Sequence, residues 1–315
     1  MKALITGISG FAGSHMAEYL LQNNVEVAGT IRQGSQMHHL MHLSGLQLVD
    51  CDLRDSAAVA AVVESTWPDI IFHLAAQSYV PVSWKSPLET LYNNIAGQLN
   101  LFEAIRHLQL PCKLLLACSS EEYGQVAPHE VPIKETHTLR PLSPYAVSKV
   151  AQEHLGYQYY KNYGMHVVVA RTFNHTGPRG GEHFVLSNFA KQIADIEKGK
   201  QPPVLWVGNL QAKRDFTDVR DVVRAYWLAL DKAVPGEAYN IASGTCHSIE
   251  EMLRILLSFS AVSIEVKPDP SRLRPSDVPM VIGDYTKFHQ AAGWKPEIPL
   301  QQTLKDLLEY WRTQP

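Results

Sequence analysis

The first half of the chain repeats one pattern, in which a short and almost continuously apolar segment is followed by a stretch with helical spacing. The apolar segments cover residues 3–6, 25–31, 46–53, 68–76, 111–120 and 165–174. Parallel strands that are buried on both faces have this composition, because neither face of the sheet meets water. Helical stretches lie between them, over residues 56–65, 88–108 and 145–163. This alternation predicts an α/β fold with a doubly wound parallel sheet.

The sequence GISGFAG joins the first apolar segment to a helical stretch. In such a loop Gly7 would allow a tight turn, Gly10 the approach of a pyrophosphate to the backbone, and Gly13 close packing of helix on strand. The phosphates would lie at the helix N-terminus beside Phe11 and Ala12, where free N–H groups and the helix dipole favour an anion. The loop therefore predicts a dinucleotide-binding domain of the Rossmann type.

The end of the second apolar segment bears on the choice of nicotinamide cofactor. NAD(H) favours a carboxylate there for its ribose hydroxyl, but this chain reads GTIRQGS. Arg32 together with Ser35 suits a 2′-phosphate, so NADP(H) is favoured and NAD(H) stays open. The alternative is that Arg32 is a solvated loop residue.

Two further strand ends are expected to line the cofactor site. Asp52 and Leu53, which follow the third segment, would flank the adenine. Leu74, Ala75 and Ala76, at the end of the fourth, would let the cofactor approach the backbone closely because their side chains are mostly small.

Tyr145 and Lys149, in the sequence SPYAVSK, lie four residues apart on an expected helix and therefore share a face. A nearby ammonium stabilises a phenolate, and lowering the pKa of a tyrosine from about 10 to near 7 takes roughly 4 kcal/mol. A tyrosine with such a pKa exchanges protons at neutral pH. The alternative is a surface helix on which the two side chains have no chemical role.

Composition limits the classes of protein to which the chain can belong. Its 315 residues, 45% apolar and 19% charged, suffice for one large or two moderate domains. The net charge of −3 and the lack of a long basic run give no support for nucleic-acid binding. Met1 leads directly into the first strand and no apolar run approaches a membrane span, so we expect a cytoplasmic protein without membrane association.

Cysteine and histidine spacing gives no metal site. The four cysteines show neither C-x-x-C pairing nor zinc-ligand spacing, and are expected to be reduced. His38 and His42 lie four apart, but no carboxylate or cysteine accompanies them at useful spacing. We therefore expect no bound metal.

The alternating pattern breaks after Asn174. We expect residues 1–173 to form the cofactor-binding domain, to which residues 214–240 return. Residues 174–213 and 241–315 would then form a smaller substrate-binding region laid against it.

The glycine loop, HLAAQ, SSEEYG, SPYAVSK and RDFTDVRD occur in the order found in extended short-chain dehydrogenases/reductases, which the chain resembles over essentially its whole length. Within that family, FNHTGP, FAKQI, RDFTDVRD, RLRPSDVP and GWKPEIPL look most like reductases of GDP-4-keto-6-deoxy-D-mannose. The resemblance implies NADPH-dependent reduction of the C4 ketone to give GDP-D-rhamnose. GDP-mannose 4,6-dehydratase activity, alone or with reduction, is the first alternative, and a non-catalytic NADP-binding regulator is the second.

The resemblance also implies roles for four residues. Tyr145 would exchange the proton at the sugar C4 oxygen, Ser119 would hydrogen-bond that oxygen, and Lys149 would bind the nicotinamide ribose. Glu121 aligns with the glutamate that removes the C5 proton in dehydratases, a step that a reductase does not need. However, PRGG at 178–181 and RDFT at 214–217 stand where dehydratases usually have PRRG and RDWG. The missing second arginine implies weaker binding of NADP. Weaker binding fits a reductase, which must release NADP+ after each turnover.

A GDP-sugar needs cationic side chains at its diphosphate. The candidates are Arg214, Arg274 and Lys191, with a surface salt bridge as the alternative for each. Asn174 would meet the diphosphate or the sugar. His175 would line the nicotinamide pocket, unless it is a structural histidine.

The resemblance further implies a homodimer, possibly a tetramer. The dimer would form by packing of the helix that carries Tyr145 with the helix over residues 88–108 into a bundle between subunits.

Overall fold

The computed structural model describes residues 1–272 and 278–315. Seven strands form a large sheet: β1 (Lys2–Thr6), β2 (Glu26–Ile31), β3 (Leu46–Asp50), β4 (Ile70–His73), β5 (Lys113–Ser119), β6 (His166–Thr172) and β11 (Ala238–Ile241). Their order is β11-β6-β5-β4-β1-β2-β3, and every neighbouring pair is parallel. The order reverses between β1 and β4, as in a doubly wound sheet, so the predicted fold class is confirmed.

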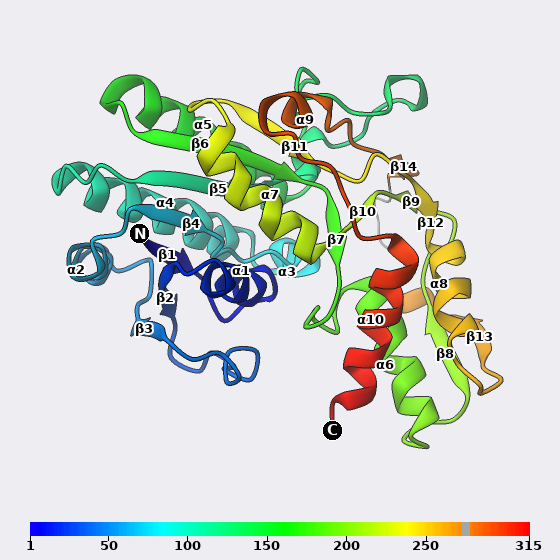
Figure 1. The fold of residues 1–315 in the computed structure, drawn as a ribbon. Helices are drawn as coiled ribbons and strands as arrows, with labels where there is room; N and C mark the ends of the chain where they lie inside the picture. The colour runs from blue at the N-terminus through cyan, green and yellow to red at the C-terminus, as the bar shows by residue number, and fades with distance from the viewer. Residues whose placement is uncertain (273–277) are drawn as a thin grey trace.

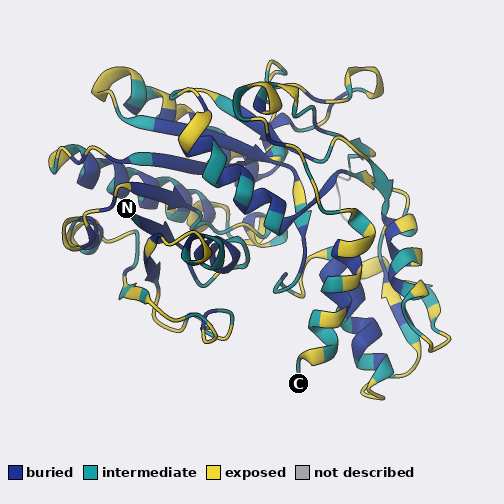
Figure 2. Cartoon of the chain, viewed as in Figure 1, coloured by how far each residue is buried: buried dark blue, intermediate teal, exposed yellow. Residues whose placement is uncertain are grey.

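Helices cover both faces of this sheet (Figure 1). One face packs against α1 (Phe11–Gln22), α7 (Val219–Lys232) and α9 (Thr286–Ala292). The other packs against α2 (Ser56–Thr66), α4 (Pro87–His107) and α5 (Pro144–Tyr163). Figure 2 shows the central strands buried between these layers, which explains their continuous apolar sequences.

The large sheet differs from the sequence prediction at two of its strands. The edge strand β3 is mostly exposed or half-buried, because β2 covers only one of its sides. The expected sixth strand over residues 165–174 is divided: β6 ends at Thr172, and Asn174 begins β7 (Asn174–Thr176), which pairs with β10 (Phe216–Asp218) in a separate sheet.

A smaller region lies beyond the ends of β5 and β6, at the right of Figure 1. It has its own apolar core, formed mainly by α6 (Val185–Glu197), α8 (Ile249–Ser258) and α10 (Leu300–Thr313). Two small sheets complete it: β8 (Val204–Val207) with β13 (Glu265–Pro268), and β9 (Lys213–Arg214) between β12 (His247–Ser248) and β14 (Met280–Val281).

The chain crosses between the two parts more than once. After β10 it returns through α7 and β11 to the large sheet. Residues 286–294, which we assigned to the substrate-binding region, also pack on that sheet: Phe288 and Trp294 are fully buried in its core. The division of the chain into two domains stays a prediction. Residues 286–294 belong in sequence to the predicted substrate-binding region, but they pack in the core of the large sheet.

Three short helices complete the part of the chain that the structure describes: α3 (Val80–Lys85), η1 (Ser120–Tyr123) and η2 (Pro128–Glu130), with a further turn, η3 (Pro270–Arg272), before the undescribed segment. Within the described residues, none of the helices combines the length and the apolar character needed to cross a bilayer.

Candidate active site

The glycine loop lies at the point where the strand order reverses, between the ends of β1 and β4. Gly7 adopts φ +72°, and a Cβ there would lie 2.9 Å from the Cα of Ala75. A Cβ on Gly13 would lie 2.3 Å from the carbonyl oxygen of Gly7, so only glycine lets α1 approach the strand this closely. Gly10 precedes α1, and no side chain caps this helix.

Phe11 and Ala12 are the first two residues of α1, and Leu74, Ala75 and Ala76 follow β4. All five are half-buried. An uncapped helix N-terminus beside a glycine cradle fits a pyrophosphate, because the N-cap residue Gly10 has no side chain to accept the N–H groups of the first turn.

A depression with a volume of about 420 Å³ lies at the other end of the expected cofactor site. Its walls combine the ends of β2 and β3: Arg32, Gln33, Gly34, Ser35, Asp50, Asp52 and Arg54. The exposed side chain of Arg32 stands at a turn in which Ser35 Oγ accepts the Arg32 N–H at 3.0 Å. Leu53 instead lies beneath α4, where a Cβ on Gly97 would be 3.1 Å from its Cβ.

Arg54 is a candidate cofactor residue that the sequence analysis missed. Its guanidinium donates to both carboxylate oxygens of Asp52 and lowers the pKa of Asp52 to about 2. Arg54 follows Leu53 directly, after the third apolar segment, where Asp52 and Leu53 are expected to flank the adenine. Extending that strand end by one residue would have found it.

Ser119, Tyr145 and Lys149 come together beside the end of β5. Ser119 is the last residue of β5, and the other two lie in the first turns of α5, which Ser143 caps by accepting the Ala146 N–H at 3.1 Å. Ser119 hydrogen-bonds the Tyr145 hydroxyl. Lys149 Nζ lies 5.9 Å from the centroid of the Tyr145 ring and donates to the Ala117 carbonyl at 2.8 Å.

The pKa of Tyr145 is raised rather than lowered, contrary to our expectation from Lys149. Burial is the main cause, because a phenolate would lose its hydration; the hydrogen bond from Ser119 opposes it, and the negative charge of Glu121 adds to it. The ammonium of Lys149 is turned toward the Ala117 carbonyl, and burial lowers its own pKa. In this structure Tyr145 therefore holds its proton at neutral pH.

The two glutamates after Ser119 point in opposite directions. Glu121 is exposed at the rim of the site, and its charge acts on Tyr145. Glu122 is fully buried, and its carboxyl accepts the Ser119 N–H at 2.9 Å. Sequence reasoning missed Glu122, although Ser119 and Glu122 have the S-x-x-E spacing of a capping box, which η1 forms.

His175 lies at the junction of the two parts of the chain. Its ring stacks on Phe11 with centroids 5.6 Å apart and planes 6° apart, which places β7 beside the N-terminus of α1. Burial lowers the pKa of His175, so the ring is neutral at neutral pH. The neighbouring Asn174 is exposed.

The three expected diphosphate cations have different surroundings. Lys191 on α6 is tied to Asp195 at 2.7 Å and lies 3.8 Å from Glu182, which fits the alternative of a surface salt bridge. Arg214 donates to the carbonyls of Lys213 and Val278. Arg274 lies outside the described residues.

Comparison with known proteins supports one family. A family model described as GDP-mannose 4,6 dehydratase matches residues 4–307. The GDP-6-deoxy-D-mannose reductase of Pseudomonas aeruginosa is 35% identical over 99% of this chain and 97% of its own. A GDP-mannose 4,6-dehydratase of Vibrio cholerae is 33% identical over 98% of this chain and 92% of its own.

Solved structures show the same fold. The structure of RMD from Pseudomonas aeruginosa complexed with NADPH has a TM-score of 0.87 at 34% identity and covers 99% of both chains. The UDP-glucose 4-epimerase of Thermus thermophilus in complex with NAD has a TM-score of 0.88 at 33% identity, again over 99% of both chains. Proteins with this fold thus include both NADPH and NAD binders.

Proposed function

The chain belongs to the GDP-mannose 4,6-dehydratase family of extended short-chain dehydrogenases/reductases, and we propose that it reduces the C4 ketone of GDP-4-keto-6-deoxy-D-mannose to GDP-D-rhamnose with NADPH. Enzymes of this family modify nucleotide sugars with a nicotinamide cofactor. The observation that supports our choice of reduction is Gly180, which is buried and stands where we expect the second arginine of a dehydratase. Tyr145, whose pKa is raised by burial, carries the proton that reduction of a ketone requires.

Dehydration makes the opposite demand on Tyr145. Its first half-reaction removes hydride from a carbon that bears a hydroxyl group, so the proton of that hydroxyl has to be accepted by a base. In the proposed reduction, Tyr145 instead gives its proton to the C4 oxygen as the carbonyl becomes an alkoxide. Ser119, already hydrogen-bonded to Tyr145, donates to the same oxygen and holds the ketone beside the phenol.

The cofactor site fits NADPH, which supplies the hydride when bound. The uncapped N-terminus of α1 and Gly10 would hold the pyrophosphate, and Lys149 would donate to the nicotinamide ribose. At the adenosine end, Arg32 and Arg54 supply positive charge for a 2′-phosphate. We propose a preference for NADPH over NADH on this ground, with Asp52 beside the adenine.

The loop at residues 178–181 supports a cofactor that is exchanged after each turnover. Gly180 stands where we expect the second arginine of a dehydratase. It is buried, and a Cβ there would lie 3.1 Å from the Gly177 carbonyl oxygen, so the loop is packed for glycine. Arg179, the arginine that is kept, binds Glu18 of α1. The loop therefore offers one guanidinium where we expect two.

For the substrate, we propose that Asn174 and Arg214 face the GDP-sugar. Asn174 is exposed at the start of β7, and Arg214 lies two residues before β10, the strand that pairs with β7. Lys191 is a weaker candidate because its ammonium is already paired with Asp195. Arg274 keeps its proposed contact with the diphosphate on sequence grounds alone.

Glu121 favours a second function, GDP-mannose 4,6-dehydratase activity, alone or together with reduction. Its carboxylate is exposed at the rim and acts electrostatically on Tyr145, which supports a role for Glu121 beside a bound sugar. A reductase has no need of a base at C5.

Two substrates separate the two functions. We expect purified protein to oxidise NADPH when given GDP-4-keto-6-deoxy-D-mannose, and to leave GDP-mannose unchanged without added reductant. Formation of a 4-keto-6-deoxy product from GDP-mannose alone would overturn the pure reductase. Glu121→Gln serves as the matched variant: reduction should stay within about threefold of wild type, whereas dehydration should fall about 100-fold or more through loss of the base.

We also propose a homodimer formed by α4 and α5. Large apolar side chains are exposed along α3, α4 and α5: Val82, Trp84, Leu88, Tyr92, Val147, Tyr157 and Tyr163. Exposed apolar surface of this kind is stabilised by a partner. Leu88→Glu should convert the dimer to a monomer in light scattering coupled to size exclusion, and an unchanged mass would contradict this assignment.

A further inference from the structure

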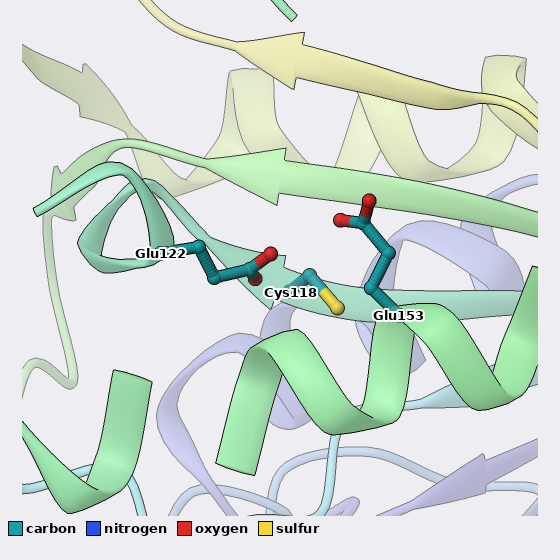
Figure 3. Close-up of side chains that lie close together, drawn as sticks. All are labelled: Cys118, Glu122 and Glu153. Atoms are coloured by element: carbon teal, nitrogen blue, oxygen red, sulfur yellow. The ribbon is translucent and has the colours of Figure 1, made fainter. Parts of the chain in front are cut away.

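A buried group of ionisable side chains lies directly behind the proposed catalytic residues. Cys118 of β5, Glu122 of η1 and Glu153 of α5 converge there, with one ligand-type atom from each lying within 4.8 Å of the others (Figure 3). Such a trio resembles a metal site in composition. However, the chain supplies its own cation: Arg171 of β6 donates to both oxygens of Glu153, at 2.7 and 2.5 Å.

Arg171 is the cation beside both buried carboxyl groups, Glu122 and Glu153. The Nη1 group of Arg171 donates to the Tyr123 hydroxyl at 2.9 Å and to the Glu135 carbonyl at 3.0 Å. Glu122 Oε2 lies 3.9 Å from Arg171 Nε, too far for a hydrogen bond. Because two carboxylates in a dry interior repel each other strongly, one of the two must keep its proton.

The geometry indicates which carboxyl is protonated. Burial opposes ionisation of Glu153, but its paired hydrogen bonds from Arg171 lower its pKa. Glu122 accepts only the neutral Ser119 N–H, and burial together with the charge of Glu153 raises its pKa to about 8. Oε2 of Glu122 is buried and accepts no hydrogen bond from the residues that the structure describes, and Glu153 is its neighbouring carboxyl group, so a proton on Oε2 can bridge the two side chains.

With Glu122 protonated, the two carboxyl groups together carry one negative charge, that of Glu153. The groups that act on the pair or face it are Cys118 on β5, Tyr145, Lys149 and His154 on α5, Tyr123 on η1 and Arg171 on β6. The Cys118 thiol donates to the Lys149 carbonyl, and burial keeps its pKa well above the usual range, so it adds no charge. Ionisation of Glu122 would therefore place a new charge behind the active site, where it acts on both Tyr145 and Lys149.

We propose that Glu122 is a positioning residue that works as a neutral acid, sharing its proton with Glu153, holding the Ser119 backbone and keeping negative charge away from Tyr145. The neutral acid makes one hydrogen bond with each of its two oxygens: it accepts from Ser119 and donates to Glu153. In this way the end of β5 is fixed against α5 at the point where Ser119 and Tyr145 meet. The inference rests on the proposed function only where kcat is measured.

The first test is independent of activity and uses Glu122→Gln, whose amide can make the same two hydrogen bonds without titrating. In wild type the folded protein binds a proton at Glu122 that the unfolded chain releases above its ordinary value of 4.5, so this group makes stability fall as pH rises toward about 8. The variant lacks this loss. We therefore expect its Tm, relative to wild type, to increase steadily between about pH 5 and about pH 8.

The matched control is Glu64→Gln, which removes an exposed carboxylate from α2. Its Tm difference from wild type should be flat over the same range. A difference for Glu122→Gln that is equally flat, or that favours wild type more at high pH, would overturn the proposal.

The second test separates positioning from simple structural support by the pH profile of kcat. At neutral pH, Glu122→Gln should keep kcat within about twofold of wild type, whereas Glu122→Leu, which leaves the Ser119 N–H without an acceptor, should lose about tenfold or more. Above about pH 8 the kcat of wild type should fall as Glu122 ionises, and that of Glu122→Gln should not. Identical alkaline limbs would refute the role of the proton. If no activity is found, the Tm series still decides the inference, and only the proposed function fails.

Discussion

At the scale of single residues, burial governs the acid–base chemistry of the site more than neighbouring charge does. Tyr145 and Lys149 share a helix face, as their spacing predicts, yet the pKa of Tyr145 is raised because desolvation exceeds the effects that favour its ionisation. The spacing of the pair was predictable. The depth at which it lies was not, because it depends on β5 and the packing of α5 against it.

Tyr145→Phe tests the proton donor. Removing the hydroxyl should lower kcat by about 100- to 10,000-fold, the usual contribution of general acid catalysis. Binding of NADPH, measured by fluorescence titration, should stay within about threefold because the ring remains. Tyr160→Phe is the control, since Tyr160 lies on the same helix and outside the proposed dimer surface. Full turnover by Tyr145→Phe would remove this tyrosine from the mechanism.

Arg32 and Arg54 test the choice of cofactor. A hydrogen bond to a charged group contributes roughly 1.5–3 kcal/mol, so Arg32→Ala should raise KM for NADPH about 10- to 100-fold and leave KM for NADH nearly unchanged. Arg54→Ala should act in the same direction, less strongly because Asp52 already holds Arg54. The measurement is the NADPH/NADH ratio of kcat/KM. Exposed Arg254 on α8 gives the control, and equal ratios for all three variants would contradict the assignment.

At the scale of elements, the site depends on how two strands end. The glycine loop after β1 has the tight turn at Gly7 and the close packing at Gly13 that its sequence predicts, since both depend on local backbone and on the adjacent strand. The turn after β5 is different. In the short η1 helix, adjacent glutamates fall on different sides, so Glu121 reaches the rim and Glu122 the interior.

Gly13→Ala tests the glycine loop. The added methyl would lie 2.3 Å from the Gly7 carbonyl, so α1 must shift away from β1. Overpacking of this kind costs roughly 1–3 kcal/mol, and we expect a lower Tm together with loss of NADPH affinity. Gly181→Ala is the control, because its methyl would make an ordinary contact 3.7 Å from Phe184. Unchanged cofactor binding in Gly13→Ala would show that the loop does not hold the pyrophosphate.

At the scale of the whole molecule, the RDFTDVRD segment joins the two parts of the chain. Asp215 accepts N–H groups from Ser243, Gly244 and Gly283. Asp218 caps α7 and accepts from Thr303 of α10 at 2.7 Å. The carboxylates of this motif thus have structural contacts, which its resemblance to a substrate-binding motif did not reveal.

Asp218→Ala tests this connection. Arg220 keeps its ion pair with Asp306, but Thr303 loses its shorter hydrogen bond and α7 loses its cap, so we expect a loss of about 1–3 kcal/mol. Urea unfolding should show a correspondingly lower midpoint. Asp231→Ala, which removes an exposed carboxylate from the same helix, should have little effect. Similar midpoints for the two variants would mean that Asp218 does not join the parts.

The sequence by itself determined the doubly wound sheet, the glycine loop and the shared helix face of Tyr145 and Lys149, because these follow from local periodicity, spacing and strand ends. The grouping of Ser119 with that pair came from the family resemblance. Only the tertiary structure decided the charge state of Tyr145, the separation of Glu121 from Glu122, the place of Arg54 and the packing of residues 286–294 on the large sheet. Those properties depend on burial and on distances between segments far apart in the chain. Desolvation and Coulomb energies change steeply with both, and no local pattern records either.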